Sequence, residues 1–299
     1  MTIKEYIEGG VERLLPLYAR EEAKALLGMA LEHFCHLPLY TYYTNPHQLL
    51  PASSLADLQR ALDELSASKP IQYILGYTLF EGCTLHVREG VLIPRPETAE
   101  MVRRAKGLLS EGAADSVLDL CTGSGAMAIS IAKAFPNVKV YGVDISEAAL
   151  EVAHENSLLN NVEVCFYKAD ILQPPDLIQP PLRPHSFDLV ISNPPYVRQS
   201  EKAAMHPNVL LYEPHVALFV PDTEPLRFYH AITDWAMVLL KDGGTLMAEI
   251  NEWMDTAVAD LFRSKGFSAI EVRKDINGKQ RVVAADFYLK GCTTGHKVT

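Results

Sequence analysis

The residues with the clearest chemical meaning are Asn193, Pro194, Pro195 and Tyr196, which follow the apolar segment FDLVIS. Proline has no N–H, so this turn offers carbonyl acceptors without competing donors, and Asn193 adds a side-chain oxygen. Tyr196 supplies a flat aromatic face on which a planar amide or base can lie. We therefore predict that these four residues bind a substrate NH2 group and form the catalytic site.

A second chemical pattern is the segment SVLDLCTGSGAMAISIA, which is typical of a buried strand, a glycine loop and a helix. Gly123 and Gly125 would let the backbone approach a nucleotide closely, and the helix N-terminus would face it. Asp144 ends the next apolar segment, where a carboxylate can accept hydrogen bonds from both hydroxyls of a ribose. The pattern predicts a ribose-containing cofactor, but it suits NAD and S-adenosylmethionine equally.

The elements that must position these residues alternate between helical and strand patterns from about residue 97 onward. This alternation predicts a mainly parallel sheet covered by helices, and the turn at Asn277-Gly278 predicts that its last strand is antiparallel. The NPPY tetrapeptide would then lie at the carboxyl end of a strand, where open parallel sheets bind ligands. The apolar strand candidates are residues 116–120, 138–143, 162–167, 187–192, 244–250, 267–272 and 281–286.

The N-terminal part of the chain has a different character. Apolar residues recur at helical spacing in three stretches, so residues 1–70 are predicted to form a small helical bundle. Ser54 and Asp57 resemble a capping box at the start of the third helix. Residues 71–96 are predicted to be a β-hairpin linker and residues 97–290 a catalytic domain, in which the proline-rich stretch 173–184 is a loop.

Composition excludes several classes of protein. A net charge of −10 argues against a broad duplex-binding surface, which needs clustered Lys and Arg. The five scattered cysteines include no CxxC pair, and the HFCH segment around Cys35 lacks a second pair of ligands, so we expect no metal site. The same cysteine pattern indicates a reducing, cytoplasmic compartment, and we expect a soluble protein because the sequence contains neither a secretion signal nor an apolar stretch long enough to span a membrane.

NPPY, DLCTGSG and DIS together resemble the amino-methyltransferases of the class I Rossmann-like superfamily. Four further segments narrow the resemblance to the release factor glutamine methyltransferases, the PrmC or HemK family. These segments are VLIPRPETAE (91–100), YEPHVAL (212–218), LMAEI (246–250) and DINGKQR (275–281).

The resemblance implies methyl transfer from S-adenosylmethionine to the amide nitrogen (N5) of the glutamine in the GGQ loop of class-1 peptide chain release factors. The helical domain would dock this protein substrate. Cys121 and Asn251 depart from the family, which usually has glycine at both positions, so the cofactor loop could be slightly reshaped. The expected cofactor contacts are Cys121, Thr122, Gly123, Ser124, Gly125, Asp144, Ile171 and Asn193.

Three alternatives remain open from the sequence. A DNA adenine-N6 methyltransferase would use the same tetrapeptide on a flipped base, but it would also need a basic groove and a target-recognition insert. A ribosomal-protein glutamine methyltransferase is the nearest relative in activity, and the IPRPET segment favours release factors instead. A non-catalytic module with the same fold would not need the intact glycine loop, Asp144 and NPPY.

Overall fold

The computed structural model describes residues 1–111, 115–178 and 182–289, and the chain divides into two compact units. Met1–Tyr77 and Met205–Glu213 form the first, which we call the helical unit. Thr78–Ala204 and Pro214–Thr299 form the second, which we call the sheet unit. The C-terminal CTTGHKVT tail lies outside the described residues.

The helical unit confirms the three helices predicted from apolar spacing. α1 begins with a capping box in which the Thr2 hydroxyl accepts from the Glu5 N–H and the Glu5 carboxylate accepts from the Thr2 N–H. Ile3, Ile7 and Leu14 are completely or almost completely buried in its core. Its elements are α1 (Ile3–Leu14), α2 (Arg20–Cys35), α3 (Thr41–Thr44), η1 (Ala52–Ser54), α4 (Leu55–Ser66) and α5 (Ile71–Leu75).

The capping box predicted at Ser54 and Asp57 is wrong. Ser54 has a helical backbone conformation (φ −95°, ψ −9°) rather than the extended one of a side-chain cap. Its hydroxyl instead donates to the Phe34 carbonyl at 2.8 Å, and Asp57 pairs with Arg60. A tertiary hydrogen bond to another helix has therefore replaced the predicted hydrogen bond within the cap of its own helix.

A short segment from the second half of the chain completes the helical unit. It contains α9 (Pro207–Tyr212). The Tyr212 hydroxyl donates to the Ala67 carbonyl at 2.9 Å, and the His206 Nε2 lies 3.3 Å from the Leu17 carbonyl. The chain thus leaves the sheet unit after residue 204 and returns to it at Pro214.

The β-hairpin predicted within residues 71–96 consists of β1 (Tyr77–Phe80) and β2 (Cys83–His86). The first residues of that range form helix α5 instead, because Ile71 and Leu75 lie one helical turn apart and both enter the core of the helical unit. On β2, Cys83 and Leu85 alternate with exposed residues and pack into the sheet unit.

The sheet unit confirms the predicted mainly parallel sheet. Within the described residues the sheet has seven strands in the order β10-β11-β9-β6-β3-β4-β5, one for each strand candidate. β11 pairs antiparallel with both neighbours, as the Asn277-Gly278 turn predicts. The strands are β3 (Ser116–Leu120), β4 (Lys139–Asp144), β5 (Cys165–Lys168), β6 (Phe187–Ser192), β9 (Leu240–Glu249), β10 (Ser268–Lys274) and β11 (Gln280–Phe287).

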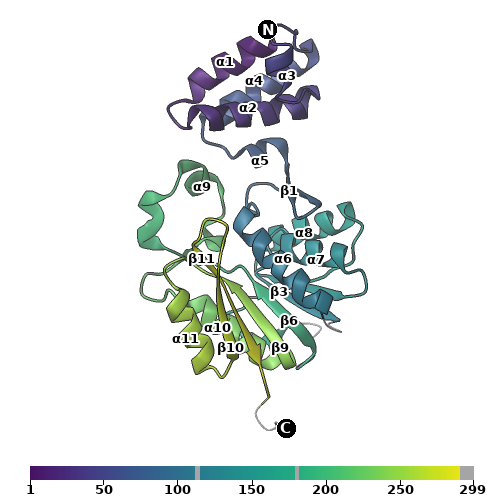
Figure 1. The fold of residues 1–299 in the computed structure, drawn as a ribbon, viewed down its shortest axis with the longest axis vertical. Coiled ribbons are helices and arrows are strands. Elements are labelled where there is room, and N and C mark those ends of the chain that lie inside the picture. Colours follow the sequence, from purple (N-terminus) through teal and green to yellow (C-terminus); the bar gives the residue numbers. More distant parts are fainter. Residues whose placement is uncertain (112–114, 179–181, 290–299) are drawn as a thin grey trace. The chain divides into compact units, whose positions relative to one another are not determined.

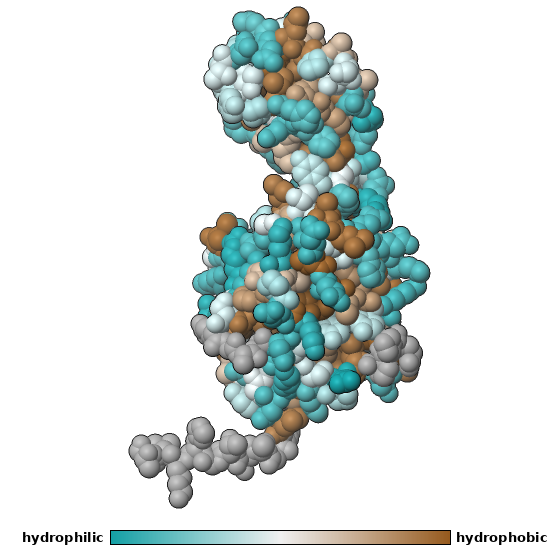
Figure 2. Space-filling view, turned by 90° about the vertical axis from the view of Figure 1, so that its right-hand side faces the viewer, coloured by the Kyte–Doolittle hydropathy of each residue, from teal (hydrophilic) through white to brown (hydrophobic). Residues whose placement is uncertain are grey.

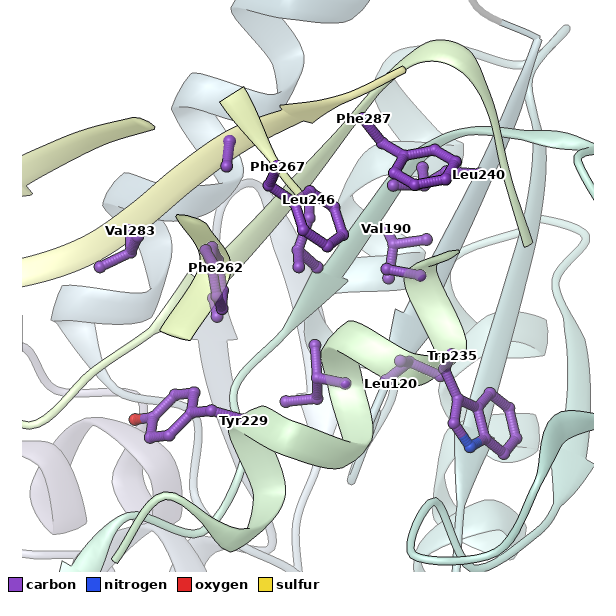
Figure 3. Close-up of a cluster of buried hydrophobic side chains, with 14 of the residues drawn as sticks. Leu120, Val190, Tyr229, Trp235, Leu240, Leu246, Phe262, Phe267, Val283 and Phe287 are labelled. Carbon is purple, nitrogen blue, oxygen red and sulfur yellow. The ribbon is translucent and has the colours of Figure 1, made fainter. Parts of the chain in front are cut away.

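Helices cover both faces of this sheet (Figure 1). Alternate strand residues point to opposite faces: Leu120 and Leu246 enter one core with α10 (Arg227–Leu239) and α11 (Asp255–Ser264). Trp235, Tyr229 and Phe262 are its largest buried side chains (Figure 3). Val117 and Met247 enter the other core with α6 (Pro96–Glu111) and α7 (Ala126–Ala134).

The remaining elements of the sheet unit are α8 (Glu147–Leu159), η2 (Pro175–Leu177), β7 (Val197–Arg198), η3 (Gln199–Ala204), η4 (His215–Ala217) and β8 (Phe219–Val220). The predicted loop at 173–184 contains only the short turn η2 where it is described, and residues 179–181 lie outside the described part. Hydrophilic residues and smaller hydrophobic patches share the visible surface of each unit (Figure 2). In the described part of the chain, every helix is too short or too polar to cross a membrane.

Candidate active site

The loop between β3 and α7 has the backbone that the glycine pattern predicts. Gly123 and Gly125 have positive φ angles of 56° and 78°, a conformation that only glycine adopts at little cost. Cys121 also has a positive φ, 62°. A cysteine therefore adopts a glycine-like conformation at the position where the resemblance implied glycine.

Asp144, at the end of β4, connects this loop to the next one. One carboxylate oxygen accepts from the Gly123 N–H at 2.8 Å and the other from the Ser146 N–H at 2.9 Å. Burial raises the pKa of Asp144, and the two backbone hydrogen bonds partly oppose this shift. Each oxygen retains a second lone pair, so the carboxylate can still accept from ligand hydroxyls.

One cavity, which we call the loop cavity, brings together residues from both chemical patterns. Its wall also includes the apolar side chains of Val91, Ile145 and Phe228, which the sequence did not suggest. A glycine without a Cβ, a carboxylate and apolar walls fit a nucleoside. The predicted site residues that line it are Cys121, Gly123, Asp144, Ile171, Asn193 and Pro195.

The other predicted site residues do not line the loop cavity. The buried Thr122 hydroxyl donates to Asp119 at 2.7 Å, and the Ser124 carbonyl accepts from Asn156. Gly125 precedes α7, where an added Cβ would lie 2.9 Å from Ile129. These three residues therefore contact the interior of the sheet unit instead of the cavity. Pro194 and Tyr196 belong to the turn described next.

The NPPY turn follows β6 and is held by a buried chain of hydrogen bonds. The Asn193 Nδ2 donates to the Thr98 hydroxyl at 3.0 Å, and Thr98 donates to Glu249 at 2.7 Å. The Tyr196 hydroxyl donates to the other oxygen of Glu249 at 2.9 Å. Burial and the neighbouring Glu249 raise the pKa of Tyr196, so it remains a neutral donor.

Sequence reasoning missed Thr98, Glu249 and Asp119, which are all buried. Thr98 and Glu249 lie in segments that carried the family resemblance, but neither received a role. The sequence did carry a signal, namely an acidic residue in an apolar strand segment. Glu249 lies at the end of such a segment and Asp119 lies inside one. Burial raises the pKa of Asp119 to about 7.

Within the described ranges, no three His, Cys, Asp or Glu side chains form a group that could hold a metal ion. Four cysteines there carry free thiols, and Cys292 lies outside the described part. His33, in the HFCH segment, makes ring contacts with Phe34 and Tyr77.

Comparisons with known proteins agree with these features. A family model described as PrmC N-terminal domain matches residues 9–76, and one described as methyltransferase small domain matches residues 105–214. In solved structures, the hMettl16 catalytic domain superposes with a TM-score of 0.56 at 14% identity, covering 74% of this chain and 82% of that one. At that identity the superposition shows the fold alone.

Two curated relatives extend the match to nearly the whole chain. The release factor glutamine methyltransferase of Flavobacterium psychrophilum is 39% identical over 96% of this chain and 100% of its own length. The protein of the same name from Bacteroides thetaiotaomicron is also 39% identical, over 92% of this chain and 96% of its own.

Proposed function

The chain belongs to the release factor glutamine methyltransferase family, and from this we propose that the loop cavity is where a release factor glutamine is methylated. The protein is a methyltransferase that uses S-adenosylmethionine. The observation that carries the proposal is that Gly123 and Asp144 of the cofactor loops line the same cavity as Asn193 and Pro195. The cofactor and the acceptor amide would therefore share one space.

We assign the cofactor to the side of the cavity formed by the loops after β3 and β4. When bound, S-adenosylmethionine supplies an electrophilic methyl group on a sulfonium sulfur. Asp144 would accept hydrogen bonds from the ribose hydroxyls, and Gly123 leaves room for the ligand because it has no Cβ. The apolar side chains of Ile145 and Ile171 would cover the flat ring of the nucleoside.

We assign the acceptor amide to the NPPY turn. An amide nitrogen is a poor nucleophile because its lone pair is delocalised into the carbonyl. The Asn193 side-chain oxygen and the Pro194 carbonyl would accept its two N–H groups, which holds the nitrogen and stabilises the positive charge that develops on it. The ring of Tyr196 would support the amide plane. The amide nitrogen would take the methyl group as its bond to the sulfonium sulfur breaks, leaving a neutral thioether, and would lose one proton to solvent.

The substrate would be the glutamine of the GGQ loop of a class-1 release factor. Its long side chain can enter a narrow pocket while glycine neighbours let the backbone approach without a Cβ clash. The helical unit would grip the folded factor at a distance and add affinity that one side chain cannot supply. Because release factors act in translation, we also propose a cytoplasmic location.

Mass spectrometry of a release factor incubated with enzyme and cofactor tests this function. We expect one added methyl group on the GGQ glutamine, and almost none on a Gln→Asn version, whose shorter amide stops short of the methyl donor. Asn193→Ala should lose nearly all turnover, because it removes the side-chain oxygen assigned to the acceptor amide. Equal labelling of both factors would contradict the proposal, and labelling of duplex DNA would favour the adenine alternative.

A further inference from the structure

Glu249 is a buried carboxylate at the end of β9, with only 1% of its surface exposed. Its two oxygens have different partners: one accepts from Thr98 at 2.7 Å and the other from Tyr196 at 2.9 Å. Burial raises the pKa of Glu249, whereas both hydrogen bonds and the charge of Arg281 act in the opposite direction. In its ionised form Glu249 can only accept hydrogen bonds, and both hydroxyls donate to it.

The direction of these hydrogen bonds determines how the Asn193 amide is oriented. A threonine hydroxyl has one proton, and Thr98 donates it to Glu249. Thr98 can therefore only accept from Asn193, which it does from Nδ2 at 3.0 Å. A flipped amide would place two acceptor oxygens against each other, so the Asn193 oxygen is the atom left available on the other side.

We propose that Glu249 is a positioning residue that orients the two polar side chains of the NPPY turn, acting on Asn193 through Thr98 and on Tyr196 directly. The inference rests on the proposed function and adds to it a reason why the turn accepts an NH2 group. With the Asn193 oxygen held ready, the turn offers an acceptor to the substrate amide. With the amide flipped, it would offer an N–H to an N–H, and the substrate would be repelled.

The first test removes one hydroxyl. Thr98→Val keeps the shape of the side chain but cannot accept from Asn193, so we expect kcat/KM for a release factor to fall about ten- to a hundredfold. Thr98→Ser restores the hydroxyl and should recover most of the activity. Thr233→Val is the matched control, because Thr233 is also fully buried in the sheet unit but donates to the His230 carbonyl within its own helix.

Calorimetric titration with S-adenosylmethionine distinguishes positioning from structural damage. The cofactor affinity of Thr98→Val should equal that of the unmodified enzyme, since Thr98 does not line the loop cavity. A loss of activity with unchanged cofactor affinity and with rescue by serine supports the inference. Equal activity of Thr98→Val and the unmodified enzyme overturns it.

The second test uses the carboxylate itself, and its single variant does not depend on the folding of Thr98→Val. Glu249→Gln has nearly the same size but replaces one acceptor with a donor, so it should lose activity to a similar degree or more. Adding Thr98→Val to Glu249→Gln should then cause little further loss, because both changes break the same chain. Independent, multiplicative losses would refute a shared role. An unmodified enzyme that methylates no release factor would instead refute the proposed function.

Discussion

Asp144 connects two loops and also lines the loop cavity, since both of its oxygens accept from backbone N–H groups. We predict that Asp144→Ala weakens S-adenosylmethionine binding by about 1.5–3 kcal/mol, the range for hydrogen bonds to a charged group. Calorimetry gives the affinity and circular dichroism checks the fold. Glu147→Gln, an exposed carboxylate on the following helix that pairs with Lys168, is the control and should bind normally. Unchanged affinity in Asp144→Ala would refute its assignment to the ribose.

The raised pKa of Asp119 should make the stability of the protein depend on pH. Burial raises the pKa of this carboxyl to about 7 in the folded state, above its value in the unfolded chain. The folded protein therefore retains a proton that the unfolded chain releases, so the free energy of unfolding should fall as pH rises from about 4 to about 7. Asp119→Asn cannot ionise and should lose this contribution. Urea unfolding of the unmodified protein and of Asp119→Asn at pH 5 and pH 8 measures this difference. If the free energy of unfolding changes equally with pH in both proteins, the prediction is wrong.

The glycine loop, at the scale of an element, should respond differently at its two glycines. Both have positive φ angles, which costs alanine roughly 1–2 kcal/mol. At Gly123 an added Cβ meets nothing within 4 Å, so Gly123→Ala should fold but bind the cofactor weakly. At Gly125 it would lie 2.9 Å from Ile129 and 3.1 Å from Ala153, so Gly125→Ala should lose roughly a further 1–3 kcal/mol of stability.

Denaturant unfolding and cofactor titration of the two variants separate these effects. Each variant serves as the other's control, since they carry the same substitution two residues apart. Equal destabilisation of both would mean that crowding at Gly125 is relieved elsewhere in the chain. Normal cofactor affinity in Gly123→Ala would remove that glycine from the binding site.

The sheet was predictable from the sequence because its strands are short apolar runs whose partners follow from the alternation of helix and strand. Two local predictions failed where tertiary contacts decided the outcome. The Ser54 hydroxyl found the Phe34 carbonyl instead of its own helix, and residues 71–75 became helical because Ile71 and Leu75 entered the core together.

The candidate site was predictable only in part. Asn193, Gly123 and Asp144 were predicted from short sequence motifs, and all three line the loop cavity. Thr98 and Glu249 are 151 residues apart, and nothing in either local segment shows that one donates to the other. The direction of a hydrogen bond depends on which donor and acceptor are in contact. The orientation of the Asn193 amide could therefore be determined only from the three-dimensional structure.

At the scale of the whole molecule, the sheet unit has its own core on both faces of the sheet and should fold alone. The truncation must begin near Thr78, because Phe80, Cys83 and Leu85 are buried in that core. We predict that residues 78–299 bind S-adenosylmethionine within about threefold of the full chain. Methylation of a whole release factor should fall strongly.

A short glycine-flanked glutamine peptide is the control for this truncation, because it is too small to need a docking domain. The truncated and full chains should methylate the peptide at similar rates. If the truncated chain also methylates the whole factor at the full rate, the helical unit does not dock it.

Because residues 205–213 belong to the helical unit, the coding sequences of the helical unit and the sheet unit are interleaved along the gene instead of following one another. A chimaera that takes residues 1–77 from a relative would keep the native His206 and set its ring against a foreign residue at the position of Tyr18. Exchange of substrate preference between family members would therefore require grafting two separate stretches of coding sequence. For the same reason, a recombination crossover between residues 77 and 205 would separate two segments that pack together in the helical unit.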